Sequence, residues 1–112
     1  MSPRATALLE RVERGQLRVR ISDLVFFEVV FTLQRSYGVP RHLIAAALLP
    51  LLELPDIVLP GKSVYREVFA LWAAPGFAHC YNAVLMQRLG LSEIISFDAE
   101  FDRMPGISRR EP

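Results

Sequence analysis

The chain has 112 residues, of which 52% are hydrophobic, and 13 basic against 12 acidic side chains give it a formal net charge of +1. These values predict one folded domain over residues 1–112, and they exclude a disordered chain and a large polycationic surface. A lone cysteine, Cys80, excludes an internal disulfide and a cysteine metal cage. No apolar run is long enough to span a bilayer and the N-terminus has no leader-like pattern, so we expect a cytoplasmic protein without membrane contact.

The first half of the chain reads as helices alternating with short strands. Gly15 and Gly38 are suitable helix ends, and Ser22 is a suitable N-cap for the apolar segment that follows it. Strict alternation of apolar and polar residues over 17–21 predicts a strand with one buried face. The elements expected here are a helix over 2–15, a strand over 17–21, a helix over 22–37, a helix from 40 through 49 or beyond, and a strand over 56–59.

The second half continues the alternation. The pair Pro75-Gly76 separates two helical segments, and Gly90 ends the second of them. The elements expected here are a helix over 63–73, a helix over 77–89, a strand over 93–97 and a last edge strand around 107. Alternating strands and helices are typical of an α/β fold with a mostly parallel sheet flanked by helices.

Two carboxylates stand out against this pattern. Glu28 lies in the middle of the apolar segment 21–33, where a charge is costly unless a cation or a metal compensates it. Asp98 directly follows the strand expected to end at Phe97. Ligands of open α/β sheets bind at the carboxyl ends of the strands, so both side chains are expected to point into one crevice above the sheet.

Three stretches in this order resemble the PIN domain, and within it toxin ribonucleases of the VapC type. Residues 21–28 look like the strand-to-helix segment that carries the family's second acidic residue, and residues 77–83 lie where the family has a phenylalanine-alanine-aspartate helix. Residues 94–101 look like the last motif, in which a strand ends in serine or threonine before phenylalanine-aspartate. The resemblance covers essentially the whole chain and implies a PIN-like three-layer sandwich.

The resemblance also implies a function. Family members are endoribonucleases in which three or four carboxylates hold Mg²⁺ or Mn²⁺ and activate water against an RNA phosphodiester. Glu28 matches the second acid, Asp98 the fourth and Ser96 the hydroxyl of the last motif, so Glu28 and Asp98 are the expected metal ligands. A VapB-type antitoxin whose tail lies over the acidic cleft, an RNA substrate and a homodimer are implied as partners. The helices around 26–33 and 43–52 are a suitable contact surface.

Two positions depart from the family pattern. The opening central strand with its aspartate is missing, and His79 stands at the third acidic position. Two carboxylates hold Mg²⁺ only weakly, and imidazole suits manganese or zinc better. The missing strand has two explanations: the true start lies about 15–20 residues upstream, or the chain is a degraded remnant. The alternative to the ribonuclease is therefore a non-catalytic PIN remnant that acts as a protein-interaction module.

Each site residue also has a structural interpretation. Glu28 could form a buried salt bridge with Arg35, and Asp98 could cap the turn that follows its strand. His79 could be a hydrogen-bonded core or cap residue instead of a catalytic residue or ligand, and Glu100 a solvated turn residue instead of a helper near the metal. Asn82, one turn beyond His79, faces similarly in a helix and could bind a metal-bound water or RNA, or cap a packed face. Cys80 is expected in the core.

Overall fold

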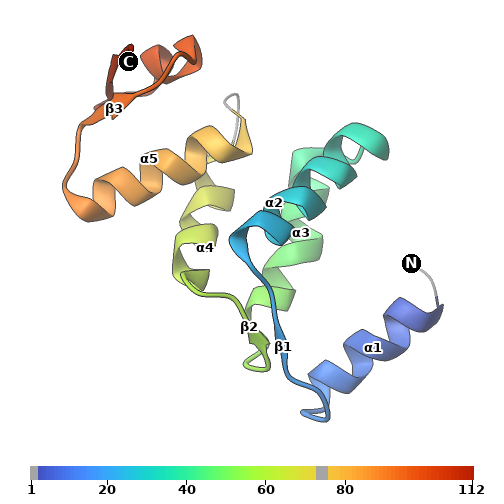
Figure 1. Ribbon diagram of the computed structural model, residues 1–112. Helices are drawn as coiled ribbons and strands as arrows, with labels where there is room; N and C mark the ends of the chain where they lie inside the picture. The colour runs from blue at the N-terminus through green and yellow to red at the C-terminus, as the bar shows by residue number, and fades with distance from the viewer. Residues whose placement is uncertain (1–2, 73–75) are drawn as a thin grey trace. The chain divides into compact units, whose positions relative to one another are not determined.

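The computed structural model describes residues 3–72 and 76–112. Its chain divides into two compact units, Met1–Lys62 and Ser63–Pro112, which we describe separately. Both units combine helices with a short pair of parallel strands (Figure 1). The mixed α/β class predicted from the sequence is thereby confirmed. The single domain and the three-layer sandwich stay predictions.

The first unit contains three α-helices, a π-helix and two strands. In chain order these are α1 (Pro3–Glu13), β1 (Val19–Arg20), α2 (Asp23–Phe31), η1 (Thr32–Ser36), α3 (Arg41–Leu52) and β2 (Ile57–Val58). β1 and β2 form a parallel pair in which Val19 lies opposite Ile57. The long helix expected over 22–37 is thus one α-helix that widens into a π-helix at its end. η1 contacts α3.

Local chemistry accounts for where these helices begin. The hydroxyl of Ser22 accepts a hydrogen bond from the backbone N–H of Val25 at 3.2 Å, as expected for an N-cap. Pro40 has extended backbone angles just before α3 and needs no N–H there. α2 buries Phe26 and Val30, whereas Leu24, Val25 and Val29 are exposed, so only one side of this apolar helix faces the core. Buried residues of this unit are Val12, Phe26, Val30, Ile44, Leu48, Leu52, Ile57 and Leu59.

The second unit contains two α-helices, a 3₁₀-helix and two strands. In chain order these are α4 (Lys62–Leu71), which begins at the boundary between the units, α5 (Phe77–Leu89), β3 (Glu93–Ile95), η2 (Ala99–Arg103) and β4 (Ser108–Arg110). β3 and β4 are parallel, with Ile94 opposite Arg109. Gly90 ends α5 with a left-handed backbone (φ 70°), which glycine adopts without a Cβ penalty.

An aromatic cluster forms the centre of this unit. Phe77, the first residue of α5, is fully buried, and its ring lies 5.0 Å from Trp72, 5.2 Å from Phe69 and 6.3 Å from Tyr65 between centroids. Edge and tilted contacts of this kind stabilise a core beyond the area they bury. Because α5 starts in this cluster, its first turn is held firmly, and the site described below lies on that turn.

The predicted element boundaries differ from the observed ones mainly at the strands. The strands expected over 17–21, 56–59 and 93–97 shorten to two or three residues, and the last strand starts one residue after Ile107. α3 continues through Pro50, so proline does not end it. The helix predicted to reach Ala73 ends at Leu71, and Ala73 and Pro75 lie outside the described residues.

Candidate metal centre

One histidine and two carboxylates converge in the second unit. Among the described residues, His79, Asp98 and Glu100 each offer a ligand atom, and these atoms all lie within 4.8 Å of one another. His79 comes from the first turn of α5, whereas Asp98 is the residue just before η2 and Glu100 lies in the first turn of η2. The imidazole is mostly buried, with 17% of its side chain exposed, and both carboxylates are about half-exposed. The cluster therefore opens to solvent on its carboxylate side.

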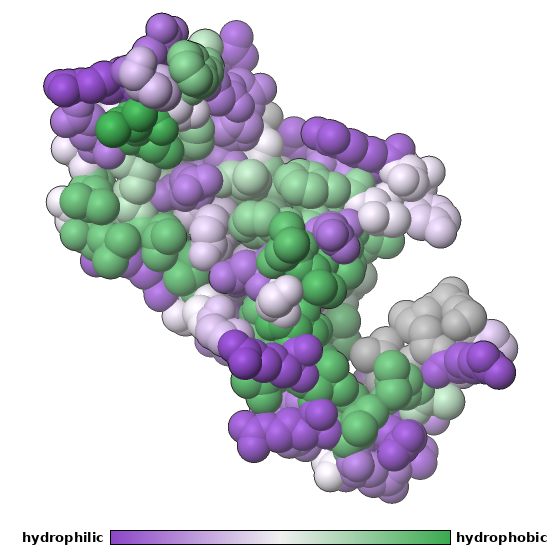
Figure 2. Space-filling view, viewed as in Figure 1, coloured by the Kyte–Doolittle hydropathy of each residue, from purple (hydrophilic) through white to green (hydrophobic). Residues whose placement is uncertain are grey.

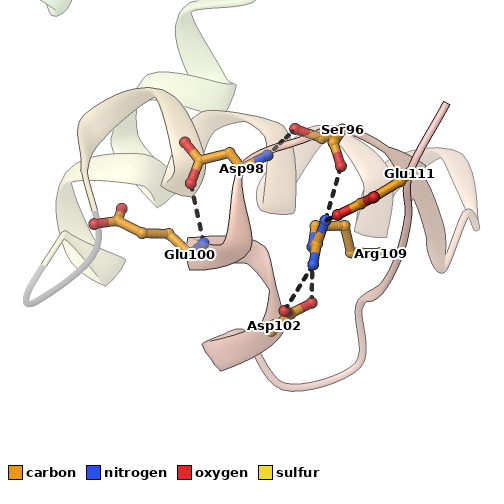
Figure 3. A network of polar contacts seen from close by, with 6 residues as sticks. All are labelled: Ser96, Asp98, Glu100, Asp102, Arg109 and Glu111. Atoms are coloured by element: carbon orange, nitrogen blue, oxygen red, sulfur yellow. Dashed lines mark hydrogen bonds and ion pairs between the residues drawn. The ribbon is translucent and has the colours of Figure 1, made fainter.

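Asp98 is fixed by the turn after β3. Its backbone N–H donates to the hydroxyl of Ser96 at 3.0 Å, and its Oδ1 accepts from the backbone N–H of Glu100 at 3.0 Å (Figure 3). This bond makes Asp98 the N-cap of η2, so the capping interpretation of Asp98 is confirmed. The same cap also directs the other carboxylate oxygen at the histidine. The cap and the histidine contact are two roles of one side chain.

The contact between His79 and Asp98 defines the proton on the imidazole. His79 Nε2 lies 2.7 Å from Asp98 Oδ2. The backbone N–H of Glu100, and then the bond from His79, hold the pKa of Asp98 below its ordinary value, so this carboxylate is ionised near neutrality. An ionised carboxylate only accepts, so Nε2 must carry the proton and donate it.

The other ring nitrogen has a different environment. His79 Nδ1 is shielded from solvent and has no hydrogen-bond partner among residues 3–72 and 76–112, although Glu100 Oε2 lies 3.2 Å away. The distance alone does not give the alignment of a hydrogen bond. When Nε2 carries the single proton of a neutral ring, the lone pair of Nδ1 and the oxygen of Glu100 are two acceptors that face the same space.

Gly76 leaves that side of the imidazole open. A Cβ placed on residue 76 would lie 2.8 Å from His79 Nδ1, closer than real Cβ atoms come. Any other residue at this N-cap of α5 would displace the ring. Phe101 covers the ring from another direction, with an edge contact of 4.9 Å between centroids. His79 is therefore held on several sides while Nδ1 keeps its place beside Glu100.

These donors fit a divalent transition-metal ion. Neighbouring ligands of one small ion lie roughly 3 Å apart, because each is about 2.1 Å from the metal, and His79 Nδ1 and Glu100 Oε2 are 3.2 Å apart. Histidines that bind metals commonly donate their other N–H to a carboxylate, as His79 does to Asp98. The donor set of imidazole and carboxylate suits manganese or zinc better than magnesium.

A second polar network adjoins the site (Figure 3). Arg109 of β4 donates from Nε and Nη2 to the two oxygens of Asp102, at 3.0 and 3.1 Å, and from Nη1 to the carbonyl of Ser96 at 3.1 Å. Its guanidinium also lies 3.3 Å from Glu111. Arg109 thus ties η2 to the end of β3. This bridge supports the turn that carries Asp98 and Glu100.

This bridge makes stability depend on pH. The bidentate bond from Arg109 holds the pKa of Asp102 below its ordinary value of 3.8. A depressed pKa contributes stability that is present above pH 3.8 and is lost as the pH falls through the folded-state value. We therefore expect Asp102→Asn to lower the urea midpoint at pH 7 and to have a smaller effect at pH 3. Equal effects at both pH values would show that the ionised bridge does not stabilise the fold.

Glu28 lies in a different environment from the one expected. It is exposed on α2, and the costly burial inferred from its apolar neighbours does not occur, because Phe26 and Val30 face the core on the opposite side. Within the part of the chain that the structure describes, Glu28 makes no ion pair, so the predicted bridge to Arg35 is absent. The guanidinium of Arg35 instead lies 5.3 Å from the ring of Phe31.

Glu28 therefore belongs to the first unit and the histidine cluster to the second. It lines a shallow groove of about 260 Å³ together with Val25, Val29, Thr32 and Leu33. Its predicted meeting with Asp98, and its role as a metal ligand, stay predictions. His79 and Asp98, which the sequence assigned separately to the site, are in direct contact.

Other expected residues lie away from the cluster. Asn82 donates from Nδ2 to the carbonyl of Ala78 at 2.9 Å, one turn back along its own helix. Cys80 is buried, as predicted, and lines a largely apolar hollow of about 590 Å³. That hollow includes none of the three cluster residues, so the hollow and the histidine–carboxylate cluster are separate features of the second unit.

The position of Glu100 beside His79 is not evident from the sequence. It is one of three acids in 98–102, and the sequence alone suggests a solvated turn. A 3₁₀-helix beginning after Asp98 places Glu100 beside His79, and this geometry could be anticipated only by recognising Asp98 as a cap for residue 100. Its Oε2 is the nearest carboxylate oxygen to Nδ1.

Comparison with protein-family models, with curated proteins and with solved structures finds no match to this chain. The function must therefore be argued from the geometry of the residues. None of the helices in the described residues is both long enough and apolar enough to cross a bilayer.

Proposed function

We propose that this protein is a metal-dependent ribonuclease of the PIN-domain, VapC-like type, with its metal held by the second unit. The observation that carries the proposal is the pairing of a shielded, unpartnered imidazole nitrogen with a carboxylate oxygen, His79 Nδ1 and Glu100 Oε2 at 3.2 Å. Two acceptors in this arrangement are stabilised by a cation between them. The resemblance of residues 94–101 to the last motif of the family supports the choice of nuclease chemistry.

The residues have distinct roles in this proposal. His79 and Glu100 hold the ion, and Asp98 holds His79 in the tautomer that leaves Nδ1 free for the metal. A bound divalent ion supplies Lewis acidity toward a phosphodiester and lowers the pKa of a water molecule. The half-exposed carboxylates leave the site open to a polymer such as RNA. Mn²⁺ is the preferred ion, and Mg²⁺ is expected to bind more weakly.

The family resemblance extends the proposal to partners. A VapB-type antitoxin and a homodimer would use surfaces outside the metal cluster, and the three-layer sandwich would require further strands beside the two observed pairs. Exposed apolar side chains on α2 and α3, among them Leu24, Val25 and Leu43, support the helical contact surface. Figure 2 shows apolar side chains gathered over α2. A cytoplasmic location accords with this assignment.

A second candidate function is a non-catalytic interaction module. It is favoured by the exposure of Ile95 and Phe97, which an isolated enzyme domain would ordinarily cover. It also agrees with the small number of carboxylates near His79. The two functions differ in one observable, which is cleavage of RNA in the presence of a bound ion.

The test uses the full chain with a 5′-labelled structured RNA and 1 equivalent or more of Mn²⁺. We expect cleavage that EDTA abolishes and that is slower with Mg²⁺. Glu28→Gln is compared with wild type to decide whether Glu28 takes part in the reaction. Binding of Mn²⁺ without any cleavage of a panel of RNAs would reject the nuclease and leave the interaction module.

A further inference from the structure

β3 is hydrogen-bonded on one side only. The carbonyl of Ser92 accepts from Ser108 N–H at 2.8 Å, and Ser96 N–H donates to the carbonyl of Arg110 at 3.0 Å, so the even-numbered residues face β4. In a parallel ladder, alternate residues direct their backbone groups to opposite sides of the strand. The N–H and C=O groups of residues 93 and 95 therefore point away from β4. Within the described residues the sheet contains only these two strands.

This free edge is apolar as well as unpaired. Ile95 is 67% exposed and Phe97, two residues later, is 76% exposed. The free edge of β1 in the first unit is different, because Arg18 and Arg20 are exposed there. Charged residues on an edge strand oppose the addition of another strand. The edge of β3 lacks this protection at its centre, and only its ends are acidic.

We propose that the free edge of β3 binds an extended strand from another polypeptide, with β-branched residues at its centre and basic residues at its ends. The backbone of Glu93 and Ile95 would supply hydrogen bonds, and Ile95 and Phe97 would contact its side chains. The preference for basic ends follows from charge. Glu93 begins the strand and Asp98 lies just past it, both with about half of the side chain exposed. Glu93 pairs with Arg110, whereas Asp98 contacts His79 and, among the described residues, no arginine or lysine.

A second copy of the same edge is a poorer occupant. Two-fold antiparallel pairing centred on Ile95 would place Glu93 of one copy opposite Phe97 and beside Asp98 of the other. Like charges in neighbouring cross-strand positions are destabilising. Arg110 of the same chain pairs with Glu93 at 2.8 Å and reduces this repulsion without removing it, because Asp98 has no such arginine among the described residues. A strand from another protein with lysine or arginine at its ends places positive charges beside the same carboxylates, and this interaction is attractive.

The experiment uses a fluorescein-labelled heptapeptide with lysine at both ends and alternating valine and threonine between them. Its binding to the full chain is measured by fluorescence anisotropy in EDTA, so the result does not depend on the proposed metal. We expect saturable binding, and at least about tenfold weaker binding for a peptide with glutamate at both ends. We expect a similar loss for the lysine peptide with N-methyl groups on alternate residues, which cannot complete the ladder.

Two variants locate the site. Ile95→Pro removes an N–H that faces away from β4, and proline is tolerated on such an edge, so binding is expected to fall at least about tenfold while circular dichroism is unchanged. Arg20→Ala on β1 is the control and should bind normally. The proposal is overturned if the lysine peptide does not bind, or if the N-methylated peptide binds as well as the unmodified one. Both results are obtained with the wild-type chain, so neither depends on whether a variant folds. Self-association that Ile95→Pro abolishes, without peptide binding, would assign the edge to a second copy.

Discussion

Glu100→Gln is expected to weaken the binding of Mn²⁺ by at least about a hundredfold, because it removes a negatively charged oxygen that faces His79 Nδ1. Loss of a residue that merely orients a ligand already costs about 10- to 100-fold in metal affinity. Glutamine retains the size of the side chain, so the turn should be undisturbed. Isothermal titration calorimetry measures the affinity, and Glu111→Gln, which alters a carboxylate bonded to Arg109 only, is the matched control.

Asp98→Asn provides the comparison that separates the two roles. Asparagine is as good an N-cap as aspartate, so the bond from the Glu100 N–H is kept, while the charge beside His79 Nε2 is lost. A positioning role predicts an intermediate loss of affinity, about tenfold, smaller than that of Glu100→Gln. If Asp98→Asn abolishes binding and Glu100→Gln has little effect, Asp98 is the ligand and the assignment given above is reversed.

The spectrum of the bound ion gives a readout that folding alone would not change. Electron paramagnetic resonance of Mn²⁺ reports nitrogen coordination, and we expect the nitrogen signature to be lost in His79→Gln and kept in Asp98→Asn. Gly76→Ala tests whether the space beside His79 Nδ1 is needed for the ion, because the added Cβ would contact that nitrogen. These readouts do not depend on RNA cleavage. They therefore test the metal site independently of the nuclease proposal.

Helices were predictable because their signals are local. Ser22 caps α2 with its own hydroxyl, and Gly90 ends α5 in the left-handed conformation, and both were read from residue type and spacing. The end of the helix expected from 40 through 49 or beyond was left open, and α3 runs through Pro50 to Leu52. Strand lengths were overestimated for a different reason. A strand ends where its partner ends, so its length depends on a distant segment and is not encoded in its own alternation.

The site was predictable only in part, because some of its signals are local and others depend on packing. His79 and Asp98 were found through motif-like surroundings, and their contact confirms that the two segments meet. The expected burial of Glu28 was wrong, because an apolar sequence around a carboxylate does not state which side of the helix faces the core. The sequence of α2 is apolar on nearly all sides, and only the packing of Phe26 and Val30 shows that Glu28 faces solvent.

The cluster of His79, Asp98 and Glu100 depends on the packing beneath it. His79 is two residues after Phe77, which is fully buried, and the buried ring of Phe101 in η2 contacts the imidazole at 4.9 Å between centroids. The site therefore joins two segments that are held by the aromatic core of the second unit. Loss of that core should remove metal binding even though no ligand is changed.

Phe77→Ala is therefore expected to destabilise the second unit strongly. Truncation of a buried phenylalanine costs about 3–5 kcal/mol, and Phe77 has no exposed area and contacts the rings of Phe69 and Trp72. Because a whole domain is commonly stable by only about 5–15 kcal/mol, cooperative unfolding in urea should be nearly lost. Phe97→Ala removes the same group from a residue that is 76% exposed, and should change the unfolding free energy by less than about 0.5 kcal/mol. Equal effects of the two substitutions would show that the aromatic cluster does not hold α5 in place.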